Sequence, residues 1–197
     1  NKTISGIPVP YFEEQSKQFG LDDNSDSNHA SFFDYDRDGD LDLFILNHKI
    51  GFKDSAKFRL KEQKDGSMKR IKTPETPFES NRLYRNDGGR FTDVTAIAGL
   101  VSSAFGLSAT PVDIDQDGWL DIYVANDFIE PDNVFFNNRD GTFTDHFFDY
   151  FKHTSHFSMG TDATDFNNDG LVDIIVVDMK SGDHVRYKEL ANPMQYD

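Results

Sequence analysis

The stretch Asp34-Tyr-Asp-Arg-Asp-Gly-Asp-Leu-Asp42 decides the fold of this chain, because its spacing returns at Asp113–Asp121 and again at Asp165–Asp173. Each copy reads Asp-x-Asp/Asn-x-Asp-Gly-x-x-Asp and leads directly into a short series of β-branched and aromatic residues. Oxygen side chains at alternate positions, with a glycine that lets the chain double back, form the kind of cage that binds Ca²⁺. The sequence therefore predicts three calcium loops, each followed by a β-strand.

The predicted ligands are the side chains at the first, third, fifth and ninth positions of each loop and the main-chain carbonyl at the seventh. The side chains are Asp34, Asp36, Asp38 and Asp42, then Asp113, Asp115, Asp117 and Asp121, then Asp165, Asn167, Asp169 and Asp173; the carbonyls belong to Asp40, Trp119 and Leu171. We expect about three Ca²⁺ ions, and calcium rather than magnesium, because Mg²⁺ usually keeps several waters. Asn167 removes one negative charge, so the third loop should bind most weakly.

The EF-hand begins with the same pattern, but it closes with a glutamate at its twelfth position and lies between two helices. The twelfth positions here are Ile45, Val124 and Val176. No carboxylate is available there, and the segments after the loops are rich in strand-forming residues. The sequence therefore favours loops between strands. Ordinary turns, in which Asp and Gly are common, would explain one such loop well but three identical spacings poorly.

The repeat is longer than the loop. A shift of 52 residues places Asp113 on Asp165 and aligns residues 81–93 with residues 133–145. The aligned segments read as hairpins with glycine-containing turns at residues 87–89 and 139–141. Each unit then contains four strands and recurs at the period of a propeller blade. We therefore predict an all-β fold of four-stranded antiparallel β-propeller blades.

The residues resemble the FG-GAP/VCBS repeats of integrin-α-type propellers. The pairing of D-x-D-x-D-G-x-x-D with N-x-L-Y-R-N-x-G-G-x-F-T-D-V-T, which starts at Asn81, is especially similar to bacterial proteins of the ASPIC/UnbV group. The resemblance covers about residues 12–179. It implies calcium in the hairpin loops on one face of the propeller and partner contacts on exposed loops.

We expect one partial propeller domain over residues 1–197. Its expected parts are the last strand of a preceding blade at 12–21, a blade at 28–100 with an insertion at 50–79, a blade at 104–150, half a blade at 156–179 and a connection at 180–197. Propellers close with about four to eight blades. The chain is therefore interpreted as part of a longer propeller, or as one whose open edges are covered by a partner chain.

The insertion at residues 50–79 is the only basic stretch, with eight of the 20 Lys and Arg residues against five acidic residues. Two interpretations stay open. It is a solvated surface excursion, or it is a docking loop for an anionic partner in which Lys69, Arg70 and Lys72 make the contacts.

Composition narrows the class of protein. A net charge of −15 argues against nucleic-acid binding. No apolar run approaches the roughly 18 residues of a membrane span. Because the chain starts with Asn1 and not with methionine, we expect it to be processed or truncated. The sequence contains no cysteine, so calcium instead of disulfides is expected to stabilise the fold. Because calcium modules that bind at about 10⁻⁴–10⁻³ M would not fill in a cytosol, we expect an extracellular, cell-surface or periplasmic location.

No catalytic signature is present, and no catalytic residue is predicted. His146, His153 and His156 lie in an aromatic stretch whose rings are expected to serve blade packing, with stacking on a sugar or binding of a transition metal as alternatives. The predicted function is a calcium-stabilised extracellular interaction module for a protein or glycan partner. The alternative is a polysaccharide lyase or hydrolase that uses the basic insertion and His48.

Overall fold

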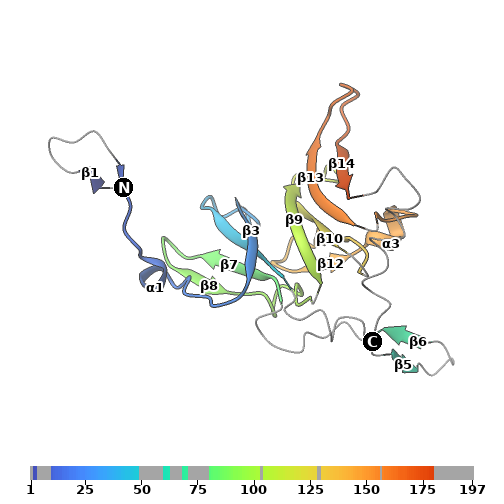
Figure 1. Cartoon of the computed structure of the whole chain (residues 1–197). Coiled ribbons are helices and arrows are strands. Elements are labelled where there is room, and N and C mark those ends of the chain that lie inside the picture. Colours follow the sequence, from blue (N-terminus) through green and yellow to red (C-terminus); the bar gives the residue numbers. More distant parts are fainter. Residues whose placement is uncertain are drawn as a thin grey trace.

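The computed structural model describes residues 12–48, 80–102, 104–127, 130–155 and 157–179, together with the backbone of residues 2–3, 10–11, 60–62 and 68–70. Two four-stranded antiparallel sheets dominate it (Figure 1). The first has the order β3 (Ser27–Phe33), β4 (Asp42–Asn47), β7 (Arg82–Asn86) and β8 (Phe91–Asp93); the second has the order β9 (Phe105–Val112), β10 (Asp121–Asp127), β11 (Asn133–Asn137) and β12 (Phe143–Asp145). The predicted all-β fold with four-stranded blade sheets is confirmed.

The remaining elements are short. β13 (Ser158–Thr164) and β14 (Asp173–Asp178) pair as a hairpin beside the second sheet, β1 (Lys2–Thr3) pairs with β2 (Pro10–Tyr11), β5 (Leu60–Glu62) pairs with β6 (Met68–Arg70), and α1 (Ser16–Phe19) and α3 (Phe147–Tyr150) are single helical turns. No helix in the described part of the chain is long and apolar enough to cross a membrane.

Each predicted loop closes a hairpin of the innermost two strands of its unit. The last residue pairs before the loops are Phe33 with Asp42, Val112 with Asp121 and Thr164 with Asp173. The ninth aspartate of every loop is therefore also the first residue of the following strand. This placement ties the geometry of the loop to the register of the sheet.

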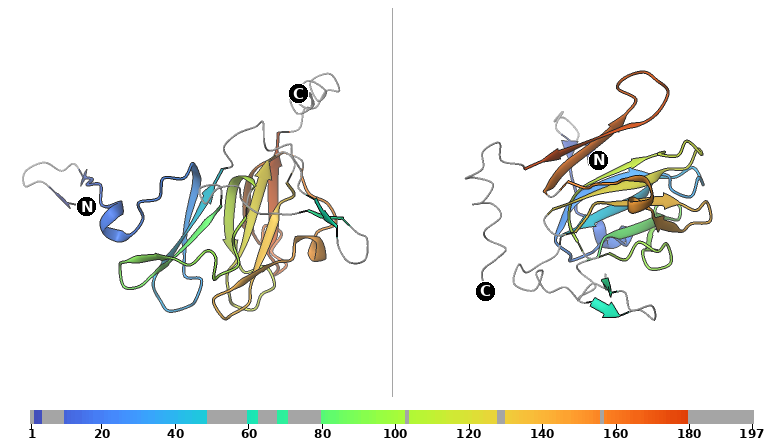
Figure 2. Two further views of the ribbon diagram at one scale, coloured as in Figure 1. Left: turned by 90° about the horizontal axis from the view of Figure 1, so that it is seen from below. Right: turned by 90° about the vertical axis from the view of Figure 1, so that its right-hand side faces the viewer.

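The core lies between the sheets, which stack on one another (Figure 2). All seven residues of β10 are buried. Ile122 and Val124 belong to a cluster shared with Phe44 of the first sheet, whereas Tyr123 belongs to a second cluster that packs against Ile174 of β14. Because alternate side chains of β10 serve opposite neighbours, the strand reads as a nearly continuous apolar run.

The inner strands β3, β9 and β13 lie side by side, and polar side chains connect them. Asn28 donates to the carbonyl of Gly106 at 3.1 Å, and Thr110 donates to the carbonyl of Thr161 at 3.2 Å. A Cβ atom on Gly106 would lie 2.6 Å from Cδ1 of Leu46 in β4, so the glycine leaves room for this buried side chain. Blade contacts therefore include backbone-directed hydrogen bonds as well as apolar packing.

The strand expected at residues 12–21 is wrong. Residues 12–15 belong to no strand, and residues 16–19 form α1, which ends at Gly20 with φ 80°. A strand needs a hydrogen-bonded neighbour for its backbone groups, and none of the described strands pairs with this segment. A helical turn satisfies some of these groups locally, as in the bond from Leu21 N–H to the Ser16 carbonyl at 2.8 Å.

The segment after α1 is nevertheless attached to the first sheet. Asp23 accepts hydrogen bonds from Arg82 Nε and from the Tyr84 hydroxyl, both at 3.2 Å. A Cβ atom on Gly20 would lie 2.6 Å from the carbonyl oxygen of Phe91, so glycine also allows the chain to pass close to β8. Both contacts fix the path of the chain into β3.

The predicted alignment of residues 81–93 with residues 133–145 is also wrong, by one residue in its first strand. In the first sheet Asn47 N–H donates to Oδ1 of Asn81 at 3.2 Å. In the second sheet Asn126 N–H donates to Oδ1 of Asp132 at 2.9 Å. Asn81 therefore corresponds structurally to Asp132, and not to Asn133.

The two glycine-containing turns explain this shift. In the first turn Asp87 N–H donates to the Arg90 carbonyl, and Gly88 and Gly89, with φ of 67° and 95°, form a two-residue turn. In the second turn Asn138 N–H donates to the Thr142 carbonyl, so this turn contains one residue more than the first turn. The 52-residue register returns after the turns.

Of the insertion at residues 50–79, the structure describes only the backbone of the β5–β6 hairpin. The side chains of Lys69, Arg70 and Lys72 lie outside the described residues, as do the predicted connection at residues 180–197 and His156.

Candidate metal sites

The three loops share one backbone conformation. In each of them the fourth residue has a positive φ although it is not glycine, which is uncommon, and the glycine at the sixth position has a positive φ as well. The values are 60° for Arg37, 60° for Gln116 and 62° for Asn168, followed by 96° for Gly39, 89° for Gly118 and 86° for Gly170. The sequence repeat is thus a structural repeat at the level of single dihedral angles.

The first aspartate of each loop holds the chain reversal in place. Its carboxylate accepts a hydrogen bond from the N–H of the glycine at the sixth position. The distances are 3.1 Å for Asp34 and Gly39, 2.9 Å for Asp113 and Gly118, and 2.9 Å for Asp165 and Gly170. Only one oxygen of Asp34 is used in this way, so its second oxygen remains available for a ligand role.

The ninth aspartate closes the first two loops from a buried position. Oδ2 of Asp42 accepts from Tyr35 N–H at 3.0 Å, and its Oδ1 accepts from Asn86 N–H at 2.9 Å. Asp121 repeats both contacts with Ile114 and Asn137, each at 2.9 Å. Asp42 and Asp121 are 0% and 1% exposed, whereas Asp173 is only partly buried.

The supporting residues Asn86 and Asn137 were missed by the sequence analysis. They lie at the ends of β7 and β11, next to the glycine-containing turns. Asn86 also donates from its side chain to the Leu41 carbonyl at 3.0 Å, and Asn137 does the same to the Leu120 carbonyl at 3.3 Å. The sequence feature that could have identified Asn86 is its place as the last residue of the N-x-L-Y-R-N motif.

Burial sets the protonation behaviour of the closing aspartates. It raises the pKa of Asp42 and that of Asp121 to about 6, although two main-chain donors on each carboxylate act in the opposite direction. Burial and the neighbouring charge of Asp38 also raise the pKa of Asp36. The loops therefore concentrate negative charge where it is poorly solvated, an arrangement that a cation would relieve.

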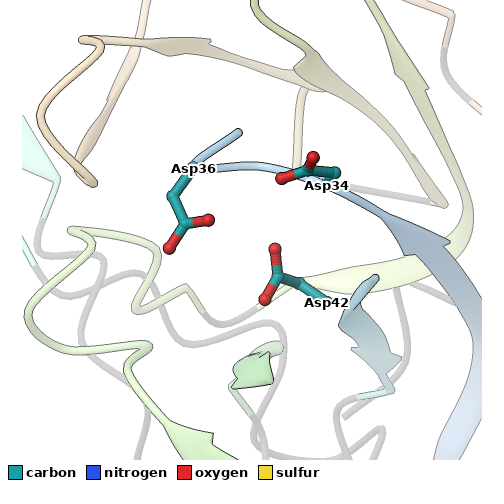
Figure 3. A group of neighbouring side chains, drawn as sticks. All are labelled: Asp34, Asp36 and Asp42. Carbon is teal, nitrogen blue, oxygen red and sulfur yellow. The ribbon is translucent and has the colours of Figure 1, made fainter. Parts of the chain in front are cut away.

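Two groups of carboxylates converge. One oxygen from each of Asp34, Asp36 and Asp42 lies within 4.8 Å of the others, and Figure 3 shows the three side chains around a common space. One oxygen from each of Asp113, Asp115 and Asp117 likewise lies within 4.8 Å of the others, with the fifth position of the loop in place of the ninth. Ligands on one Ca²⁺ ion at about 2.3–2.6 Å can be at most about 5 Å apart, so both groups fit one ion each. In the described chain the third loop shows no three-carboxylate group.

Buried oxygen atoms provide a separate test of the fit. Oδ1 of Asp34 and Oδ1 of Asp36 are buried without a hydrogen-bond partner, and so is Oδ1 of Asp40. Leaving such atoms without a partner is costly. These atoms belong to the loop whose carboxylates converge in Figure 3, so the residues present fit a calcium ion held by side-chain oxygens.

The aromatic stretch after β12 divides between core and surface. Phe147 and Phe157 are buried, whereas Phe148 and Tyr150 are 74% and 60% exposed. Tyr150 stacks on Phe136 with ring centroids 4.7 Å apart. His146 hydrogen-bonds to Asp149 at 2.7 Å. Blade packing therefore accounts for only part of this stretch.

A hollow of about 300 Å³ lies next to the second loop. Its walls include Asp115, Arg139, His146 and Tyr150. A stacked aromatic ring beside carboxylate, guanidinium and imidazole groups is suited to a polar ligand with an apolar face.

The family model described as "FG-GAP-like repeat" matches residues 75–124 and residues 113–176. The matched segments together run from the second half of the first sheet to β14 and include the second and third loops. No curated protein matches the chain.

Proposed function

The chain belongs to the FG-GAP-like repeat family, and on this basis we propose that it is a calcium-stabilised interaction module that works outside the cytoplasm. Within the family we assign it to the VCBS-type, integrin-α-like propellers and to the ASPIC/UnbV-type group, because it combines the calcium-loop motif with the N-x-L-Y-R-N hairpin. We propose one ion for each loop, three in total, with the ligands named above.

The unsatisfied carboxylate oxygens of Asp34 and Asp36 carry this proposal. Two carboxylates about 4 Å apart repel each other by about 1–4 kcal/mol at intermediate dielectric. Without a cation this repulsion acts directly on the hairpins of the blades. At 100-fold excess over its dissociation constant, one bound ion would add about 2.7 kcal/mol of stability. Calcium thus acts as a structural component of the blades.

The location follows from the same energetics. Calcium modules that work outside cells bind with dissociation constants of about 10⁻⁴–10⁻³ M, and only extracellular or periplasmic calcium would fill such sites. The sequence has no cysteine and so offers no disulfide as a substitute. We therefore propose an extracellular, cell-surface or periplasmic protein.

The proposed partner is a protein or a glycan, because family members typically serve as interaction modules. The hollow at Tyr150 supports a glycan, since its exposed ring can stack on a sugar face beside hydrogen-bonding groups. Further blades or a partner chain are proposed to cover the exposed face of β14, where Ile175 and Val177 are 63% and 55% exposed.

The alternative function is a polysaccharide lyase or hydrolase with His48 in the reaction. The His48 ring lies edge-on to Phe105 at 5.0 Å, and the main-chain N–H of His48 donates to the Asp26 carbonyl at 2.8 Å. His48 is thus held by packing and hydrogen bonding, which favours the interaction module over the enzyme. Glycan turnover that disappears in His48→Ala would favour the enzyme.

The proposal is tested by glycan-array binding in millimolar calcium and in chelator, with product analysis of each bound glycan. A module predicts calcium-dependent retention, no cleavage, and loss of retention in Tyr150→Ala. The matched control is Phe148→Ala, which removes an exposed aromatic side chain that does not line the hollow. Cleavage of the glycan would contradict the module.

A further inference from the structure

The fourth residue of the first loop reaches the second loop. The guanidinium carbon of Arg37 lies 5.4 Å from the centroid of the Trp119 ring. Its Nη1 atom would be 3.4 Å from a Cβ atom placed on Gly118. Arg37 thus contacts the sixth and seventh positions of the neighbouring loop, and the seventh position supplies a proposed carbonyl ligand.

The same contact occurs between the second and third loops. Gln116, at the fourth position of the second loop, donates from Nε2 to the carbonyl of Gly170 at 2.6 Å. Gly170 directly precedes Leu171, whose carbonyl is the proposed ligand of the third loop. Although arginine and glutamine differ chemically, both use the left-handed fourth position, with φ of 60° in each case, to reach the next loop.

A buried link runs parallel to the first of these contacts. Asn137 donates from Nδ2 to the Tyr35 carbonyl of the first loop at 2.8 Å. Its main-chain N–H donates to Asp121 of the second loop at 2.9 Å. Tyr35 N–H in turn donates to Asp42 at 3.0 Å. Tyr35 and Asn137 therefore join the closing aspartates of the first and second loops through a chain of hydrogen bonds.

We propose that the loops are energetically coupled, so that an ion in one loop raises the calcium affinity of the next. Arg37, Gln116 and Asn137 are the positioning residues. An ion that orders the first loop fixes Arg37 and the Tyr35 carbonyl, and the second loop then loses less conformational freedom when it binds. This inference rests on the proposed calcium function and adds cooperativity to it.

The chain contains a site-specific probe for this coupling. Trp119 is its only tryptophan, and it lies in the second loop beneath Arg37. Calcium titration followed by tryptophan fluorescence therefore reports the midpoint of the second loop. Asp36→Ala removes a side-chain ligand of the first loop without changing a residue of the second. In the otherwise natural chain, we expect this substitution to raise the midpoint about fivefold, the lower end of typical couplings.

The coupling contact is removed by Arg37→Asn. Asparagine occupies the equivalent position of the third loop as Asn168, with φ 62°, so the backbone accepts it. In the Arg37→Asn background we expect Asp36→Ala to raise the midpoint by about twofold or less, because the remaining coupling passes through Asn137. Through-space charge effects of Asp36→Ala act in both backgrounds and cancel in the comparison. Arg90→Asn, at an exposed arginine outside the loops, is the control and should preserve the fivefold effect.

Two results would overturn the coupling. One is a natural-chain midpoint that does not respond to Asp36→Ala, and the other is an equal response in the Arg37→Asn background. Stepwise affinities from calorimetry give the same ratios if the fluorescence signal is silent. Failure of the calcium function itself is distinguishable, because the natural chain would then bind no calcium by calorimetry.

Discussion

The main-chain N–H of Asn86 donates a hydrogen bond of 2.9 Å to Oδ1 of Asp42, and Asn137 makes the same bond to Asp121. In each sheet the strand next to the loop hairpin therefore holds the residue that closes the loop. An ion bound by Asp42 would be linked through one hydrogen bond to β7, and through the sheet to the rest of the blade. Loop occupancy and blade stability are expected to change together.

Asp42→Asn tests this link. An amide has one acceptor oxygen, whereas the carboxylate accepts from both Tyr35 and Asn86. We expect the calcium-free protein to lose about 1–3 kcal/mol, the cost of one unsatisfied buried donor. Calorimetry should find one ion fewer than in the natural chain. Asp22→Asn, at an exposed carboxylate outside the loops, is the control and should change neither quantity.

Calcium affinity should fall in acid. The pKa of Asp42 and that of Asp121 are raised to about 6 by burial, and a ligand must be deprotonated to bind a metal. We expect the affinities of the first and second loops to be about tenfold weaker at pH 5 than at pH 7.5, since most of each carboxyl is protonated at the lower pH. Calorimetric titration at the two pH values measures this, and equal affinities would contradict it.

The same pKa shifts have the opposite effect on the calcium-free fold. Both folded pKa values lie above the ordinary value of 3.8. The folded state therefore binds these protons more tightly than the unfolded chain does. The resulting stability is fully present below about pH 4 and is lost as the pH rises through about 6. Urea unfolding in chelator should show this contribution as the difference between the natural chain and Asp42→Asn.

Asn167→Asp should strengthen the third loop. The substitution restores the charge that the first two loops carry at this position, as Asp36 and Asp115. We expect a several-fold rise in the weakest of the three affinities and little change in the other two. Stepwise calorimetry measures this, and an unchanged weakest affinity would show that ligand charge does not set the order.

Asp132 offers a test away from the loops. It is 1% exposed, burial raises its pKa, and it accepts from the Tyr123 hydroxyl at 2.8 Å and from Ser158 at 3.1 Å. Asn81 occupies the equivalent place in the first sheet. Asp132→Asn should therefore stay within about 1 kcal/mol of the natural chain, whereas Asp132→Leu should lose about 3 kcal/mol by leaving buried donors unsatisfied. Urea unfolding of both variants measures this; equal losses would contradict it.

The sequence was informative where a local pattern dictates local geometry. The loop spacing predicted hairpins, and residues as different as Arg37 and Asn168 adopt the same backbone angles because the flanking aspartates and glycine impose them. The strand-forming residues after the second loop predicted a β-strand, and β10 lies there with all its residues buried. The assignment of individual ligands remains a prediction, supported by the converging carboxylates.

Features that depend on distant partners were not predictable. The segment that starts at Phe12 resembles the one that starts at Phe91, where β8 lies. It forms no strand, because a strand also needs a neighbouring strand to pair with, and Phe12 is 79% exposed. Asn81 corresponds to Asp132 because the second glycine-containing turn is one residue longer than the first. The sequence does not reveal this difference, since the residues of the two turns look alike when they are aligned. The contact between Arg37 and Trp119 joins residues 82 positions apart and depends on how two sheets stack.

Thermal melting in millimolar calcium and in chelator, together with calorimetric calcium titration, tests the central claim most directly. Three bound ions and a large rise in melting temperature with calcium are the predicted result. Absence of binding, or binding without stabilisation, would contradict the account, because the loops would then be ordinary turns whose carboxylates hold no structural ion.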